Sequence, residues 1–298
     1  MESKTTVLRS ILIGAVAATL LWAAPARADG TTFGFIAPHE WDFPVEFKPF
    51  SAVVQYGWLS SRSDAFDADG DKVDMGGDTT SLVGLSKFAY FFQLDALPKV
   101  GWAAVAVVPE ISVRGDSLSA SGIGDPMFAF PVVWFRPVPQ LLLGGSYWLS
   151  VPWGSDDVSN HYWSHMPLAF ADLNVGPVNV DLDVGYSFNG TAKKTNADDF
   201  HTGDTFFTNV RLAYRDPKHG FIGKFEPFVA LDYQRVSSSE TMDGADMTNS
   251  KSNELAFGGG LGFYPVNSVS IHLSYRRSVD GENTPVGDMA YFKVMFIP

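Results

Sequence analysis

The sequence predicts an all-β protein, a transmembrane antiparallel β-barrel of about twelve strands. Three observations predict it: an export signal at the N-terminus, long segments in which apolar and polar residues alternate, and connections that are short and long in turn. Strict alternation is the period of a β-strand with two different faces. An outer-membrane barrel turns an apolar face to lipid and keeps polar residues inside.

Residues 1–28 have the three parts of a secretory signal peptide. Lys4 and Arg9 form a basic start, the apolar run ILIGAVAATLLWAA follows, and the small residues of APARA precede the mature chain. The apolar run is shorter than the roughly 20 residues that a membrane-spanning helix needs. We therefore expect cleavage after Ala28 and a single barrel domain over residues 29–298.

Composition excludes several classes of protein. The chain has 21 Lys and Arg against 33 Asp and Glu, a net charge of −12, which becomes −14 without residues 1–28. Nucleic-acid binding needs a basic face, so no nucleic-acid partner is expected. There are no cysteines, so an exported barrel must be stable without disulfides. No apolar run of about 18 residues follows the leader, so no transmembrane helix is expected in the mature chain.

Twelve alternating segments are expected to be strands, and most reach the roughly 9–11 residues that a tilted strand needs to cross a bilayer. In PVNVDLDVGYSF, for example, every second residue is apolar or aromatic, and Asp181 and Asp183 lie on the other face. Boundaries read from a sequence are uncertain by a few residues. The segments are 49–59, 79–95, 99–114, 124–136, 139–152, 162–175, 177–190, 203–216, 221–236, 252–265, 267–279 and 287–297.

The connections favour a membrane barrel over a soluble β-sandwich, whose strands also alternate. Tight turns such as ALPK, GP and YPVN join many pairs, and polar loops near 61–77, 115–123, 154–161, 191–202, 237–251 and 280–285 join the rest. Short turns at one end and long loops at the other are typical of outer-membrane barrels. Strands of a soluble protein usually have only about 5–6 residues. Aromatic residues near the strand ends also favour the membrane barrel, because aromatic side chains prefer the level of the lipid headgroups.

Ionisable residues on the polar faces are expected to line the lumen. They comprise seven cations and seven anions, and a lumen with one dominant sign would instead indicate an ion-selective pore. A nearly neutral lumen favours uncharged or amphipathic cargo, although each residue could also serve only to pair with another charge across the interior. The expected lumen-lining residues are Lys87, Glu110, Arg114, Asp172, Asp181, Asp183, Arg211, Arg215, Lys224, Glu226, Asp232, Glu254, His272, Arg276 and Lys293.

Weaker motifs leave other functions open. A Ser164–His165 relay, or His272, could serve a membrane-embedded hydrolase, although the GxSxG and HExxH motifs are absent. A closed structural or adhesive barrel is a third interpretation. The acidic loop from Asp67 resembles a calcium loop, but Asp78 stands where the bidentate Glu belongs. A solvated acidic loop is therefore favoured, and neither a metal nor a cofactor is expected.

Residues 29–48 precede the first expected strand. They contain Pro38, Trp41 and Pro44 and show no alternation. Two arrangements are open, a small plug inside the barrel or a tail outside it. They differ in consequence, because a plug would obstruct the lumen.

Four stretches carry a resemblance to a known family: SGIGDPMFAF (121–130), DADGDKVDMGGDTTSL (67–82), YWSHMPLAF (162–170) and VNVDLDVGYSFNG…DFHTGDTFFTNVRLAYR (178–215). The chain resembles outer-membrane proteins of the meta-pathway of phenol degradation family. The resemblance implies an outer-membrane β-barrel that admits hydrophobic or aromatic compounds, and it supplies no catalytic residues. Glycine permits close backbone approach and Asp caps a turn. The matching turn positions are Gly122, Gly124, Asp125, Gly203 and Asp204.

Together these observations predict an outer-membrane channel of a Gram-negative bacterium for the passive uptake of small hydrophobic or aromatic, phenol-like compounds. An enzyme is not expected. The expected partners are the solute, outer-membrane lipid with lipopolysaccharide, and the barrel-assembly machinery during biogenesis.

Overall fold

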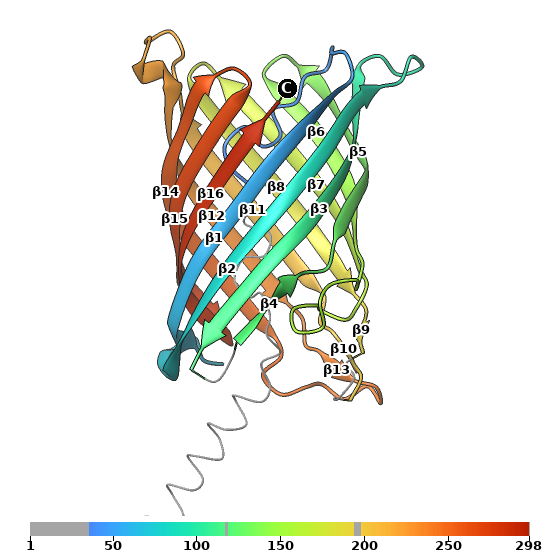
Figure 1. The fold of residues 1–298 in the computed structure, drawn as a ribbon, viewed down its shortest axis with the longest axis vertical. Helices are drawn as coiled ribbons and strands as arrows, with labels where there is room; N and C mark the ends of the chain where they lie inside the picture. Colours follow the sequence, from blue (N-terminus) through green and yellow to red (C-terminus); the bar gives the residue numbers. More distant parts are fainter. Residues whose placement is uncertain (1–35, 117–118, 194–197, 298) are drawn as a thin grey trace, which may run out of the picture.

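A computed structural model describes residues 36–116, 119–193 and 198–297 and shows a closed antiparallel barrel of twelve wall strands (Figure 1). Each wall strand pairs with the next, and β1 pairs with β16 to close the barrel. The wall strands are β1 (Phe50–Phe66), β2 (Lys72–Gln93), β3 (Val100–Gly115), β5 (Met127–Val138), β6 (Leu141–Ser150), β7 (Ser164–Val175), β8 (Val178–Asn189), β11 (Thr205–Tyr214), β12 (Phe225–Val236), β14 (Ser252–Val266), β15 (Val269–Glu282) and β16 (Thr284–Phe296).

The predicted fold class and strand number are confirmed, whereas the expected signal peptide lies outside the described residues. Two predicted loops are wrong. β1 and β2 continue into the expected loop 61–77 and leave only 67–71 between them, and β15 and β16 meet at Asn283, whose φ is +48°. Most residues of these hairpin ends are polar on both faces, so their strands extend beyond the lipid into water, where strict alternation is no longer required.

The two ends of the barrel differ (Figure 1). At the upper end in that view, which we call the short-turn end, lie the C-terminus and the connections between β2 and β3, β7 and β8, and β14 and β15. The opposite, long-loop end carries β4 (Ser119–Ile123) beside β3 and a small sheet of β9 (Thr191–Ala192), β10 (Phe200–His201) and β13 (Glu240–Thr241). In an outer membrane, short turns are periplasmic and long loops are extracellular.

Along β8 the outward side chains are apolar and the inward ones are polar. On β8, Leu182, Val184 and Tyr186 are exposed, whereas Asp181 and Asp183 are no more than 1% exposed. A soluble sandwich would bury the apolar face instead. The arrangement fits a wall with lipid outside, and the sandwich is thereby excluded. No helix in the described ranges is long and apolar enough to cross a membrane.

Candidate functional site

Residues 36–48 lie inside the barrel, ahead of β1, and we call them the plug. Ile36, Ala37, Glu40 and Trp41 are at most 7% exposed, and their contacts reach strands on several sides of the lumen. Of the two arrangements open from the sequence, the structure therefore has the plug for these residues, and the tail is excluded for them.

Aromatic contacts hold the plug near the short-turn end. The Trp41 ring stacks on Phe170 with 4.2 Å between centroids. The Phe170 ring lies over Gly144. A Cβ at that position would lie 2.3 Å from the ring, so glycine is required there. Trp134, fully buried, donates from Nε1 to the Pro44 carbonyl over 2.8 Å. These buried aromatic surfaces contribute to seating the plug.

Glu40 joins the plug to one side of the wall. Its Oε1 accepts from Tyr56 Oη over 2.6 Å and from Lys87 Nζ over 3.0 Å, and its Oε2 pairs with Lys293. Burial alone would raise the pKa of the Glu40 carboxyl, but the charges of Lys293 and Lys87 hold that pKa well below its usual range. Glu40 is therefore a buried anion that neutralises two lysines of β2 and β16.

His39 joins the plug to the opposite, acidic side. Its backbone N–H donates to Asp181 over 2.5 Å, and its Nε2 lies 2.7 Å from Glu226 Oε1. Its φ of +56° is a left-handed conformation that makes a tight turn. Burial lowers the pKa of the imidazole, but Asp42, Glu226 and Asp181 outweigh it and raise that pKa to about 10. Adjacent residues of opposite charge thus span the lumen.

The plug should loosen as pH rises. The His39 pKa is 6.5 in a solvated reference and about 10 in the seated plug, so its stabilisation is complete below pH 6.5 and is lost as pH rises through about 10. We expect the open fraction of single channels in planar bilayers to grow over this window. In His39→Gln, which stays neutral, this pH dependence should disappear; the same slope in both proteins would contradict the role of His39.

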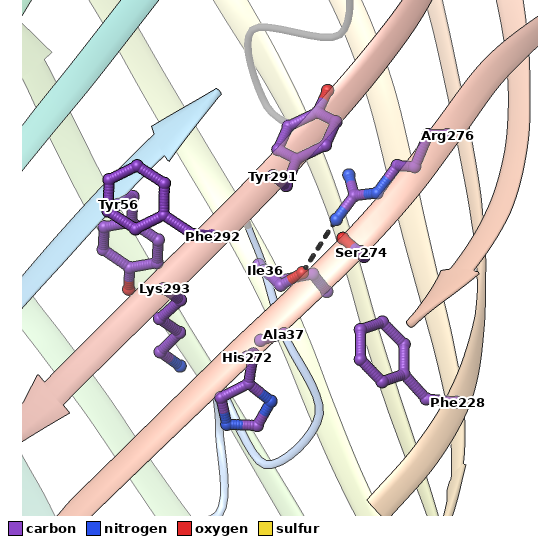
Figure 2. Close-up of a pocket in the computed structure, with 10 residues that line it drawn as sticks. All are labelled: Ile36, Ala37, Tyr56, Phe228, His272, Ser274, Arg276, Tyr291, Phe292 and Lys293. Carbon is purple, nitrogen blue, oxygen red and sulfur yellow. Dashed lines mark hydrogen bonds between the residues drawn. The ribbon is translucent and has the colours of Figure 1, made fainter. Parts of the chain in front are cut away.

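Two arginines fix the start of the plug. Asp232 pairs with Arg211 and with Arg276, each over 2.7 Å, and all three side chains are at most 2% exposed. Arg211 Nε donates to the Ile36 carbonyl over 2.8 Å, and Arg276 donates to the same oxygen over 3.3 Å (Figure 2). The ion pairs that brace the barrel therefore also bind the plug backbone.

A mainly apolar cavity of about 110 Å³ lies between the plug and the wall. Met127 and Met166 belong to the parts of β5 and β7 nearer the long-loop end, whereas Trp134 and Phe170, which hold the plug, lie nearer the short-turn end. The plug is thus the floor of the cavity. The lining residues are Ile36, Glu40, Trp41, Tyr56, Leu85, Lys87, Val107, Met127, Trp148, Met166, Leu168, Asp183 and Phe207.

Most of the expected lumen-lining residues face the interior. Asp172 accepts from Asn179 over 2.7 Å, Glu254 accepts from Ser278 over 2.5 Å, and His272 packs edge-on to Tyr264. Those that the structure buries inside are Asp172, Asp181, Asp183, Arg211, Glu226, Asp232, Glu254, His272, Arg276 and Lys293, with Lys87 partly buried.

Two further residues of that set lie at the short-turn end. The Arg215 guanidinium lies 3.7 Å from the centre of the Tyr264 ring, and its Nε donates to the Gly223 carbonyl over 3.0 Å. Lys224 belongs to the 3₁₀ turn η1 (Ile222–Lys224) and donates to the Pro265 carbonyl over 2.8 Å. Lys224 is therefore at the rim rather than on a strand face.

Glu110 and Arg114 are exceptions, because they face outward. They pair by register with Gly84 and Thr80 on the outer face of β2, and Glu110 lies 2.7 Å from Ser86 Oγ, which donates to it. The inner face of β3 is apolar and packs into the core around the plug. Both faces of β3 contain apolar residues, so alternation does not identify the inner one. Without Glu110 and Arg114 the lumen has one fewer charge of each sign and is still close to neutral.

The turn positions of the family resemblance hold the long loops. Asp125 accepts from Gly154 N, Ser159 Oγ and Asn160 N over 3.0, 2.7 and 2.7 Å, and so anchors the loop between β6 and β7. A Cβ at Gly122 would lie 2.5 Å from Ser155 Oγ of that loop. These residues position loops at the rim and do not line the cavity.

The second turn repeats this arrangement. In this second turn, a Cβ at Gly203 would lie 1.9 Å from the Ser237 carbonyl oxygen. In the first turn, a Cβ at Gly124 would lie 2.7 Å from the Ile111 side chain. Asp204 accepts from the Asn189 N–H over 2.9 Å. Close backbone approach and side-chain capping are the two properties that glycine and aspartate bring to such turns.

Sequence reasoning missed the charged residues of the plug. Alternation predicts positions only for charges on strand faces, and it gives none for His39, Glu40 and Asp42 in the segment PHEWD. An adjacent His–Glu pair between a proline and a tryptophan, with no strand pattern, was the available signal. Charged residues within an apolar segment indicate buried partners.

The Ser164–His165 relay of the hydrolase interpretation is wrong. Ser164 Oγ lies 2.5 Å from Ser187 Oγ, a residue buried inside, whereas His165 is exposed on the outer face and lies 2.6 Å from Tyr147 Oη. Neighbouring residues on a strand point to opposite faces, so they cannot exchange a proton directly. No group of three or more metal-ligating side chains occurs in the described part of the chain.

A closed barrel with an apolar outer face, a charged interior and a plugged lumen defines an outer-membrane channel protein. The chain belongs to the family described as the putative MetA-pathway of phenol degradation, which matches residues 62–294. It is similar to the crystal structure of the COG4313 outer membrane channel from Pseudomonas putida F1, with 16% identity, a TM-score of 0.74, and coverage of 91% of this chain and 100% of that one. The protein is therefore located in the outer membrane of a Gram-negative bacterium.

Other barrels are less similar. A FadL homologue from Pseudomonas aeruginosa matches with 10% identity and a TM-score of 0.46, covering 84% of this chain and 90% of that one. The CymD monoaromatic hydrocarbon channel matches with 9% identity and a TM-score of 0.45, covering 90% and 94%. No curated protein matches the sequence.

Proposed function

We propose that the protein lets small hydrophobic or aromatic solutes cross the outer membrane passively. The observation that carries this proposal is the cavity on the long-loop side of the plug, with its wall of methionine, leucine and aromatic side chains. An apolar cavity of about 150 Å³ can hold benzene. The volume of about 110 Å³ here is of the same order and leaves room for no more than one ring.

The plug argues against a general water-filled pore. Trp41, stacked on Phe170, and Trp134 are nearly fully buried at the level of the plug. Hydrophilic solutes gain nothing from an apolar cavity, whereas an apolar ring gains about 1.5–3 kcal/mol on burial. Preferential binding above the plug would concentrate aromatic solutes at the point where passage begins.

Filling the cavity should slow the passage of phenol. Met166→Trp is expected to reduce phenol permeation into proteoliposomes about tenfold or more, because losing roughly 1.5–3 kcal/mol of ring burial corresponds to one to two orders of magnitude. Met242→Trp is the matched control, since Met242 is exposed in a loop. Unchanged permeation in Met166→Trp, with the barrel intact by its heat-dependent gel shift, would exclude this cavity as the route.

A further inference from the structure

The groups that hold Glu40 all belong to the wall. Tyr56, Lys87 and Lys293 come from β1, β2 and β16, and Tyr56 lies directly opposite Lys293 in the pairing of β1 with β16. Figure 2 shows Tyr56 and Lys293 as neighbours on these adjoining strands. Three donors meet the two oxygens of one carboxylate. We call these three residues the carboxylate site.

The carboxylate site opens into the cavity. Tyr56 and Lys87 line the cavity, and so does Glu40 itself. Val107 and Met127 line the same cavity and offer apolar surface for a ring. The wall therefore presents donors for a carboxylate beside a space for one ring. Lys87 also donates to Tyr56 Oη over 3.2 Å, and the carboxylate that these donors meet is that of Glu40, a residue of the plug.

We propose that the carboxylate site binds solutes, and that it takes the carboxylate of a monocyclic aromatic acid, which displaces Glu40 while the ring occupies the cavity. The inference rests on the proposed function of the cavity and adds a solute class and a way of releasing the plug. Loss of Glu40 alone would leave two ammonium groups without their anion, which is costly. Exchange of one carboxylate for another keeps both lysines paired.

A free carboxylate must compete with Glu40, which is tethered beside the carboxylate site, and this competition sets the concentration of free carboxylate that is needed. Glu40 is bonded to Trp41, which stacks on Phe170 of the wall, so it acts at an effective concentration that is in the millimolar range for short linkers. A free carboxylate must match this concentration, and burial of its ring lowers the concentration needed. Benzoate should therefore act at lower concentrations than acetate. Phenol can occupy the cavity but brings no anion to replace Glu40.

The test uses a single cysteine, because the chain has none. In Ala37→Cys the thiol is placed at a buried plug position, so its alkylation by a maleimide reports release of the plug. Benzoate, acetate and phenol are compared at equal millimolar concentrations. We expect benzoate to accelerate alkylation several-fold, acetate less, and phenol not at all. Adding Lys87→Met should abolish the benzoate effect relative to that variant's own rate, whereas Lys251→Met, an exposed control, should not.

A second readout does not need the cysteine. In planar bilayers, benzoate should raise the open fraction of the unmodified protein, and phenol should not. Equal effects of benzoate and phenol, or no benzoate effect, would overturn the inference. Phenol permeation into vesicles of the same preparation separates the two proposals. Permeation without a benzoate effect removes this inference alone, and the absence of both removes the proposed function as well.

Discussion

Replacing Glu40 with Ala is expected to produce the largest change in channel behaviour, a strong increase in the open fraction of single channels. The Glu40 side chain is 5% exposed, and its partners Lys87 and Lys293 are 14% and 5% exposed. Breaking a buried ion pair costs about 3–5 kcal/mol, because it leaves an uncompensated charge. At about 1.4 kcal/mol per decade, the seated fraction of the plug should fall by roughly two to four orders of magnitude relative to the released one.

Planar-bilayer recordings at neutral pH measure this effect. Glu46→Ala is the matched control, since Glu46 is an exposed plug residue. Glu40→Gln should be intermediate, because an amide oxygen still accepts from Tyr56 but neutralises neither lysine. Indistinguishable recordings for Glu40→Ala and the unmodified protein would contradict the electrostatic seating of the plug.

Replacing Asp232 with Ala should produce the largest loss of stability. Asp232 is fully buried and pairs with both Arg211 and Arg276. Removal of the carboxylate takes the shared anion away from two buried guanidinium groups. The free energy of unfolding is expected to fall by about 3–5 kcal/mol. Because both arginines also donate to the Ile36 carbonyl, the plug should loosen as the barrel weakens.

Urea unfolding in detergent or vesicles, followed by tryptophan emission, gives the change in midpoint. Asp280→Ala serves as the control, because Asp280 is exposed on β15. Asp232→Asn retains the shape and isolates the effect of charge. Equal midpoints for Asp232→Ala and Asp280→Ala would show that the buried pairs do not stabilise the barrel.

Much of the wall could be predicted from the sequence, because lipid on one side and polar groups on the other impose alternation on each strand. On β8 the inward placement of Asp181 and Asp183 follows from this pattern alone. On β3 the same reasoning fails. Its inner face meets the aromatic residues around the plug rather than water, so both faces are apolar, and the pattern predicts the wrong face for Glu110.

Partners across the lumen could not be predicted. Asp232 lies on β12 and Arg276 on β15, and their meeting depends on strand register and barrel closure. The plug posed a different difficulty, since a segment without periodicity carries no signal of where it lies. Only its charges and tryptophan required buried partners, and those partners come from strands distant in sequence.

We propose that the barrel carries small aromatic compounds selectively. The most direct measurement compares cells with and without the gene for uptake of a neutral phenolic and of a sugar of similar size, at concentrations where the outer membrane limits the rate. We expect faster uptake of the phenolic and no change for the sugar. Equal acceleration of both would indicate a general pore, and no change in either would indicate a closed barrel; each result would contradict selective passage through the cavity.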